Sequence, residues 1–160
     1  MTRVVLVPGV LALLPEYAGL EDPVAELRAA ALEAVAWLGR EVTVLADAQG
    51  ARVAAHLLET ASRAGDEASY LVVGNGSAKR TEKAPGHFDE RAEQFDRALG
   101  ESLRAGHPAV DQALARELWA STEAIVELAE LDDGLGEAQV DYDDAPYGVQ
   151  YWVMRWNSGS

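Results

Sequence analysis

The first 74 residues alternate between short apolar runs and longer segments of helical spacing, and this alternation most restricts the fold. Runs rich in β-branched residues at 3–7, 41–46 and 69–74 predict three strands. The intervening segments, 22–39 and 51–65, carry apolar residues at helical spacing and end in glycine, so they predict two helices. This order, with short connections, is typical of a parallel sheet with right-handed crossovers.

The second half of the chain changes character. Residues 88–106, 107–121 and 121–131 predict three further helices, and "EAQVDYDDAPYGVQYWVMRW" predicts two antiparallel strands joined by a turn. We therefore expect a single α/β domain over residues 1–156, with a flexible polar tail at 157–160. Its sheet is expected to be mostly parallel, flanked by helices on both faces, with an antiparallel C-terminal hairpin.

The composition excludes several classes of function. The chain has 27 acidic and 13 basic residues and a formal charge of −14, which argues against binding to nucleic acids or anionic membranes. It has no cysteine, which excludes disulfides, thiolate zinc sites and cysteine nucleophiles and fits a cytoplasmic location. The apolar N-terminus is interrupted by Pro8 and Gly9, so we expect a buried strand rather than a signal peptide or membrane span.

A glycine-bearing loop follows the third predicted strand. In open α/β sheets, ligands bind beyond the carboxyl ends of the strands, here Pro8-Gly9, Asp47 and the loop from Gly74. This loop, "GNGSAKRTEKAPG", contains the only two lysines of a strongly acidic chain. We therefore predict that it binds a small anionic or aromatic molecule. The predicted ligand-binding residues are Gly74, Asn75, Gly76, Ser77, Lys79, Arg80, Thr81, Lys83 and His87.

Each residue type in the loop has an expected role. The glycines allow positive φ and close approach, so that successive backbone N–H groups form an anion-binding nest. The cations add charge, and Ser77 and Thr81 add hydroxyl donors. The loop matches neither the Walker A motif nor the dinucleotide fingerprint, since both require glycine at position 79. The alternative interpretation is a solvated strand-to-helix loop with turn glycines.

The histidines give little support to a metal centre. His56, His87 and His107 are the only three, and they form no HxH, HxxxH or HExxH spacing. His87 alone lies in the loop, whereas His56 is expected to pack in a helix and His107 to cap a helix or to be exposed. We predict no metal site, and the sequence identifies no catalytic residue.

Three stretches carry a family resemblance. "LVVGNGSAKRTEKAPGHFDERAEQFDRAL" and "YDDAPYGVQYWV", with the opening "VVLVPGVLALLPEYAG", resemble actinobacterial proteins of the class III extradiol ring-cleavage dioxygenase superfamily, the group similar to the catalytic subunit. The resemblance implies an α/β fold with a pocket at the carboxyl ends of the strands. It also implies non-haem Fe(II) held by two histidines and a carboxylate.

The chain departs from that family where the iron ligands are expected. Gly9 stands where the family has a histidine after its first strand, and residues 77–80 read Ser-Ala-Lys-Arg where active relatives have a Ser-His pair. The chain is also shorter than the family between residues 38 and 52. No iron ligand therefore carries over, and the resemblance implies a shortened member that retains the loop and lacks the metal.

Three functional hypotheses follow from these observations. The first is a dioxygenase-like protein without ring-cleavage activity, which binds a small anionic or aromatic ligand or a protein partner at the Gly74–Gly86 loop. The second is a metal-dependent dioxygenase-like enzyme that uses His87 with Asp47 or Glu82. The third is a structural or interaction subunit, in which the basic loop contacts Asp143 and Asp144 of the hairpin turn. An edge strand would also allow self-association into a homo-oligomer.

Overall fold

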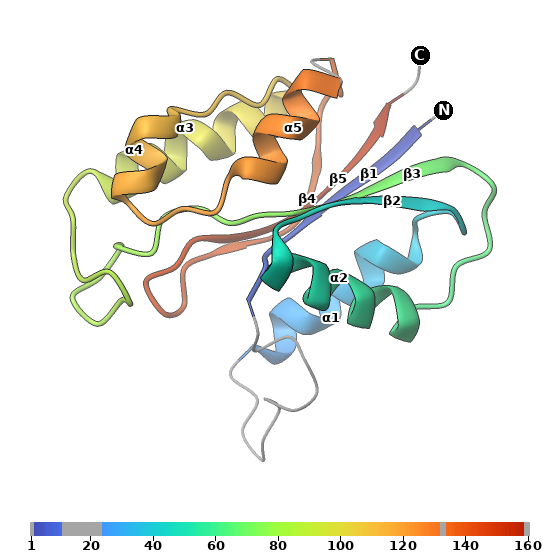
Figure 1. The fold of residues 1–160 in the computed structure, drawn as a ribbon, viewed down its shortest axis with the longest axis horizontal. Helices are drawn as coiled ribbons and strands as arrows, with labels where there is room; N and C mark the ends of the chain where they lie inside the picture. The colour runs from blue at the N-terminus through green and yellow to red at the C-terminus, as the bar shows by residue number, and fades with distance from the viewer. Residues whose placement is uncertain (1, 11–23, 132–133, 159–160) are drawn as a thin grey trace.

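The computed structural model describes residues 2–10, 24–131 and 134–158, which form five strands and five helices around one sheet (Figure 1). The elements in chain order are β1 (Thr2–Val7), α1 (Ala25–Ala36), β2 (Val42–Leu45), α2 (Ala48–Thr60), β3 (Ala68–Val73), α3 (Ala92–Ala105), α4 (Gln112–Glu117), α5 (Glu123–Leu131), β4 (Gln139–Asp144) and β5 (Tyr151–Ser158).

The sheet is mixed, so the expectation of a mostly parallel sheet is wrong. Its strand order is β2-β3-β1-β5-β4. The β2–β3 and β3–β1 pairs are parallel, whereas the β1–β5 and β5–β4 pairs are antiparallel. The predicted C-terminal hairpin is present, but β5 lies against β1 inside the sheet rather than at its margin. Almost every side chain of β5 is buried, which accounts for its place between two other strands.

The two helical crossovers of the N-terminal half lie on the same face of the sheet. Helices α1 and α2 share one buried cluster and appear together below the sheet in Figure 1. The chain steps from β1 past β3 to β2 and then back to β3. Two parallel crossovers that step in opposite directions over one face must have opposite hands. The expectation of right-handed crossovers therefore holds for only one of them.

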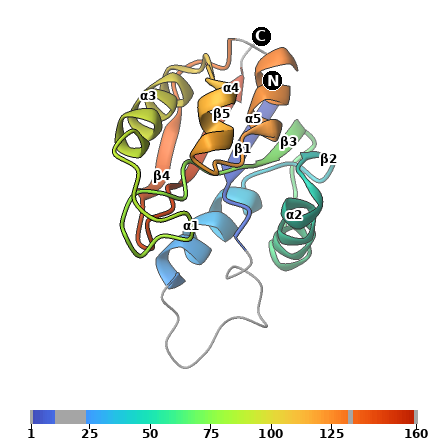
Figure 2. The ribbon, with the colours of Figure 1, turned by 60° about the vertical axis from the view of Figure 1, so that its left-hand side comes forward.

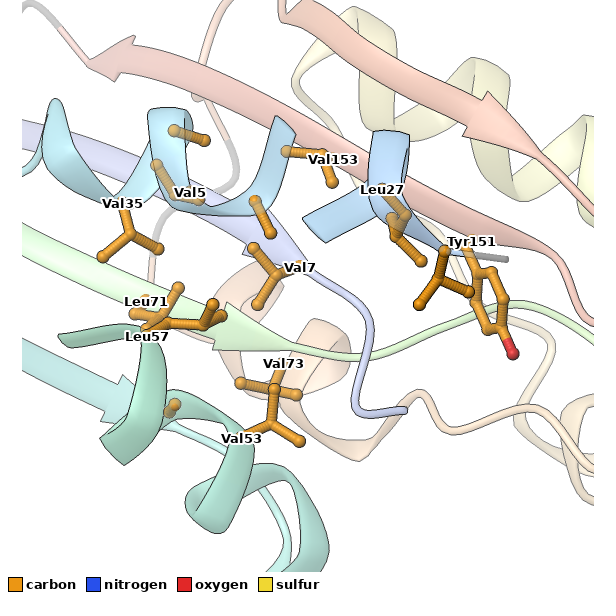
Figure 3. Packing of buried hydrophobic residues seen from close by; sticks show 14 of the residues in the cluster. Val5, Val7, Leu27, Val35, Val53, Leu57, Leu71, Val73, Tyr151 and Val153 are labelled. Atoms are coloured by element: carbon orange, nitrogen blue, oxygen red, sulfur yellow. The ribbon is translucent and has the colours of Figure 1, made fainter. Parts of the chain in front are cut away.

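Side chains alternate between the two faces of the sheet and build two cores. Val5, Val7, Leu71 and Val153 face α1 and α2 (Figure 3). Their chain neighbours face the opposite way, toward α3, α4 and α5, and these are Val4, Leu6, Val72, Trp152, Met154 and Trp156. Figure 2 shows the two helical layers on either side of the strands. This period of two follows from strand geometry and buries both faces of the central strands.

Capping side chains place the starts of two helices away from their predicted positions. Asp47 accepts a hydrogen bond from the N–H of Gly50 at 2.7 Å, so α2 begins at Ala48 rather than near residue 51. Asp111 accepts one from Leu114 at 3.1 Å, so α4 begins at Gln112 and not near residue 107. The expected start of the first helix at residues 22–23 lies outside the described residues, and α1 is described from Ala25.

The chain remains ordered in the sheet nearly to its C-terminus. Strand β5 continues to Ser158, which pairs with Thr2, and Asn157 pairs with Arg3. The expected tail from residue 157 is therefore corrected at these two positions, and residues 159–160 lie outside the described part of the chain. Within the described ranges, no helix combines the length and apolar composition needed to cross a membrane.

Candidate functional site

The predicted loop leaves the sheet at a point where neighbouring strands send the chain to opposite faces. The chain passes from β1 to α1 on one face, whereas the loop after β3 leads to α3 on the other. The N–H of Gly74 donates to the carbonyl of Val7 at 3.0 Å, which keeps the exit of β3 beside the end of β1. Such a divergence between adjacent parallel strands is where open α/β sheets bind ligands.

The first part of the loop, residues 74–80, is fastened to three other elements, and we call it the anchored segment. Its backbone N–H groups donate to Ser121 from Asn75 (2.9 Å), to Gln150 from Gly76 (2.9 Å) and to Leu118 from Ala78 (3.0 Å). The N–H of Ser77 donates to the Asp96 carboxylate at 2.7 Å. These donors are occupied within the protein, so this segment has no free row of N–H groups for an anion.

The two glycines of the anchored segment permit close packing rather than an unusual backbone. Neither Gly74 nor Gly76 has a positive φ, contrary to the role expected for them. A Cβ at Gly76 would lie 2.6 Å from an Asp96 oxygen, and one at Gly74 would lie 2.8 Å from the carbonyl of Ser121. Both positions therefore exclude a side chain because other parts of the protein press against them.

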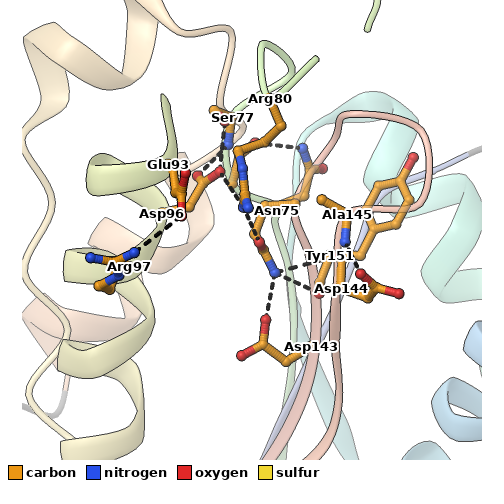
Figure 4. A network of polar contacts seen from close by, with 12 residues as sticks. Asn75, Ser77, Arg80, Glu93, Asp96, Arg97, Asp143, Asp144, Ala145 and Tyr151 are labelled. Carbon is orange, nitrogen blue, oxygen red and sulfur yellow. Dashed lines mark hydrogen bonds and ion pairs between the residues drawn. The ribbon is translucent and has the colours of Figure 1, made fainter. Parts of the chain in front are cut away.

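Asp96 is the buried polar group on which the anchored segment depends. Its side chain lies in α3, is 3% exposed, and accepts the Ser77 hydroxyl at 2.7 Å in addition to the Ser77 N–H (Figure 4). The Arg80 guanidinium lies 3.4 Å from the same carboxylate. Burial raises the pKa of Asp96, although the hydrogen bonds from Ser77 and the charge of Arg80 act in the opposite direction.

The sequence analysis missed Asp96 as a member of this site. The available signal was its spacing, because Asp96 falls among Ala92, Leu99 and Leu103 at helical intervals on the buried side of α3. A carboxylate within an apolar stripe requires hydrogen-bond partners, and here they come from a loop nineteen positions earlier.

The structure separates the three cations of the loop. The ammonium of Lys79 lies 5.4 Å from the centre of the Trp119 ring. Arg80 turns inward and donates to the Gln150 side chain at 2.7 Å. Lys83 is exposed and forms no hydrogen bond or ion pair with any described residue. The expected joint action of the three cations on one anion is therefore not the arrangement observed.

The hairpin turn meets the loop through Gln150 rather than through a direct ion pair. The Gln150 amide accepts from Arg80 and donates to Asp143 at 2.7 Å, while Asp143 also pairs with Arg104 of α3. Asp144 accepts the N–H of Ala145 at 2.8 Å, within the hairpin itself. The contact that the sequence suggested between the basic loop and these two aspartates is thus indirect.

Residues 81–87 form the second part of the loop, which we call the open segment. It faces the hairpin turn across a cavity of about 460 Å³, which we call the loop–turn cleft. Its walls are Thr81, Glu82, Lys83, Pro146, Tyr147 and Gly148. Apart from the buried Ala84 and Gly86, the segment is exposed. The predicted ligand residues Thr81 and Lys83 therefore line a hollow, whereas residues 74–77 do not.

The two walls of the loop–turn cleft are fixed to each other. The N–H of Arg80 donates to the carbonyl of Gly148 at 3.0 Å. Gly148 has a φ of 76°, and a Cβ there would lie 2.5 Å from the side chain of Ala84. Only glycine fits this backbone conformation and this contact, so the turn can approach the loop closely.

The residues proposed as iron ligands are not arranged as a metal site. His87 has a positive φ of 60° in the exposed segment, and its N–H donates to Ala84 at 2.9 Å. Asp47 is occupied as the cap of α2. Among the residues that the structure describes, no group of three or more histidines and carboxylates is placed to hold a metal ion. The set of His87 with Asp47 or Glu82 therefore does not fit Fe(II).

Comparisons of this chain with protein-family models and with curated proteins return no match. The likeness to the extradiol dioxygenase superfamily stays a prediction from the quoted motifs. Any function must therefore be argued from the residues and cavities themselves.

Proposed function

We propose that this protein binds a small aromatic anion in the loop–turn cleft and lacks ring-cleavage activity. The observation that carries the proposal is the pairing of an exposed lysine with an exposed tyrosine across one cavity. Lys83 supplies a positive charge without a partner among the described residues, and Tyr147, whose side chain is 44% exposed, supplies an aromatic surface. Thr81 adds a hydroxyl on the same wall as Lys83.

The dimensions and lining of the cleft suit such a ligand. Its volume of about 460 Å³ falls within the range of roughly 300–1,000 Å³ typical of small-molecule pockets. The ring of Tyr147 and the face of Pro146 can stack on an aromatic ring, while the Lys83 ammonium meets its carboxylate. Glu82 also lines the cleft, and its negative charge repels an anion and lowers the affinity for it.

The bonds between the walls support binding without a large rearrangement. Arg80 and Gly148 join the loop to the turn by a backbone hydrogen bond, and the anchored segment is held by Asp96 beneath it. A cleft with fixed walls loses little conformational entropy when a ligand enters. The absence of ring cleavage rests on Gly9 and on residues 77–80, which replace the family's iron-binding histidines in sequence.

Titration with benzoate tests the proposal, using thermal stability and tyrosine NMR signals as readouts. We expect saturable binding that raises the melting temperature, because a ligand that binds only the folded state stabilises it. Lys83→Ala should weaken binding at least about fivefold, which corresponds to roughly 1 kcal/mol. Glu82→Gln should strengthen it. The matched control is Lys79→Ala, which removes the other lysine of the loop and should leave the affinity unchanged.

Two results would overturn the proposal. One is the lack of any saturable change with benzoate or 4-hydroxybenzoate. The other is an equal loss of affinity in the Lys79 and Lys83 variants, which would indicate a diffuse charge effect. Oxygen uptake with catechol in the presence of Fe(II) tests the proposed lack of ring-cleavage activity. Stoichiometric ring cleavage would contradict it.

A further inference from the structure

A second cavity lies between α3 and the hairpin, and Arg80 is one of its lining residues. Its volume is about 170 Å³, and we call it the helix–hairpin cavity. Its charged lining residues are Arg80, Glu93, Asp96, Arg97, Arg104 and Asp143. None of them belongs to the loop–turn cleft, and of the predicted ligand residues only Arg80 lines this cavity.

The charges around the helix–hairpin cavity balance. Each arginine stands beside one carboxylate: Arg97 pairs with Glu93 at 3.1 Å, Arg80 lies 3.4 Å from Asp96, and Arg104 pairs with Asp143 (Figure 4 shows part of this network). A simple anion would add an unbalanced charge to this set and would also meet the field of a chain with charge −14. A ligand that carries both charges avoids both costs.

An indole N–H without an acceptor among the described residues lines this cavity. The Trp152 side chain is 1% exposed, yet its Nε1–H donates to no residue that the structure describes. Trp156, two positions later on the same face of β5, donates its Nε1–H to the carbonyl of Leu103 at 3.0 Å. The Nε1–H of Trp152 is not among the buried polar atoms that lack a partner, so it stays accessible from the cavity. It is therefore available to an acceptor that enters the cavity.

Gly100 leaves space in front of that donor. It is the only glycine within α3, and a glycine in a helix interior is unfavourable relative to alanine. The nearest atom to a Cβ at this position would be Nε1 of Trp152, at 3.4 Å. An alanine would fit there without severe overlap. The glycine is thus not required by packing, and its effect is to keep the edge of the indole open to the cavity.

An unused acceptor stands nearer the solvent. Glu93 pairs with Arg97 through Oε1, whereas its Oε2 accepts no hydrogen bond from the described residues. The Glu93 side chain is 66% exposed, so it marks the open end of the cavity, and Trp152 marks the buried end. An N–H donor at the buried end and a carboxylate at the open end match a ligand with two opposite charges.

We infer that the helix–hairpin cavity binds a small α-amino acid. Its carboxylate accepts from Trp152 Nε1–H and from the adjacent guanidinium groups, and its ammonium group lies beside Glu93. The cavity holds roughly five or six water-sized groups at about 30 Å³ each, which limits the ligand to the size of glycine or alanine. Charge-assisted hydrogen bonds at both ends would select for this pair of groups.

The test is a titration of ¹⁵N-labelled protein with glycine and with alanine, following the four tryptophan indole N–H signals. We expect a saturable shift of the Trp152 signal, identified by its loss in Trp152→Phe. Acetate and methylammonium, which each carry one of the two charges, should bind at least tenfold more weakly. Leucine should bind more weakly than alanine because it exceeds the cavity.

A substitution at Gly100 separates ligand binding from stability. In Gly100→Ala, the alanine methyl group covers Nε1 of Trp152, so added free glycine should no longer shift the Trp152 signal. The same substitution should raise the melting temperature, because alanine favours the helix. Glu101→Ala, at the next and exposed position of α3, is the control and should leave binding unchanged. The inference fails if neither amino acid gives a saturable shift, if acetate binds as tightly as glycine, or if Gly100→Ala binds normally. Each result is independent of benzoate binding in the loop–turn cleft.

Discussion

The anchored and open segments of one loop differ in almost everything except composition. Both contain glycine, a hydroxyl side chain and a basic residue. Residues 74–80 donate hydrogen bonds to Gln150 just before β5, to the connection between α4 and α5, and to Asp96 in α3, and Ser77 is completely buried. In residues 81–87 both the hydroxyl and the ammonium group are exposed. The same residue types thus stabilise the fold in one half of the loop and remain available to a ligand in the other.

This difference arises from what lies next to each half. The anchored segment passes between α3 and β5, where any polar group must find a partner inside the protein. The open segment extends beyond those elements and meets only the hairpin turn. Substitutions in the first half should therefore change the free energy of unfolding, and those in the second should change ligand binding.

The largest effect is expected at Asp96. Asp96→Ala should lower the free energy of unfolding by about 3 kcal/mol, because it leaves the Ser77 N–H and hydroxyl and the Arg80 guanidinium without their buried acceptor. Urea unfolding followed by tryptophan fluorescence measures this loss. Asp96→Asn keeps an acceptor for Ser77 and should cost less than half as much. Equal stability of wild type and Asp96→Ala would contradict the anchored character of residues 74–80.

Tyr151, at the start of β5 in the hairpin, should make the free energy of unfolding depend on pH. Burial raises the pKa of Tyr151 to about 12, so the folded protein retains a proton that the unfolded chain loses near its ordinary value of about 10. The stability that this neutral tyrosine contributes is present below pH 10 and is lost as the pH rises toward 12. The loss should be on the order of 2 kcal/mol. Unfolding curves between pH 9 and pH 12 measure it, and in Tyr151→Phe the dependence should be visibly smaller.

A matched pair of hydroxyl deletions compares the two segments directly. Ser77→Ala should cost about 1 kcal/mol, because it removes one buried hydrogen bond to Asp96. Thr81→Ala, in the open segment, should change stability by less than about 0.5 kcal/mol. Both values come from the same urea unfolding experiment. A loss at Thr81 as large as that at Ser77 would mean that the open segment is also structural.

The smallest effect on stability is expected at Lys83. Lys83→Ala should alter the free energy of unfolding by less than about 0.5 kcal/mol, because its ammonium has no partner among the described residues. Lys79→Ala should cost slightly more, since it removes the contact with the Trp119 ring. This order is the reverse of the order proposed for benzoate affinity. If Lys79→Ala loses more stability and Lys83→Ala loses more benzoate affinity, the two lysines have different roles: Lys79 stabilises the fold and Lys83 binds the ligand.

Much of the secondary structure was predictable because its causes are local. The apolar β-branched runs of β1 and β3 and the helical period of α2 and α3 are visible in neighbouring residues, and all these elements occur. Helix ends were less predictable, since Asp47 and Asp111 cap from positions that a periodic pattern does not reveal. The expectation of a mostly parallel sheet was wrong because the antiparallel pairing of β1 with β5 joins residues about 150 positions apart.

The candidate site was predictable in place but not in detail. The carboxyl end of β3 follows from the α/β pattern, and the loop there borders both cavities. The sequence did not predict that Lys79, Arg80 and Lys83 point to different places. Their positions depend on distant parts of the chain, namely Trp119, Gln150 and the hairpin turn.

The sequence by itself determined the α/β character, the loop after the third strand and the lack of histidine pairs for a metal. Periodicity, glycine content and residue identity suffice for these because each is a local property of the chain. Tertiary structure alone decided the mixed sheet, the burial of Asp96 and the two cavities beside the loop. Those features depend on contacts between segments far apart in the chain, whose partners only the folded backbone brings within hydrogen-bonding distance.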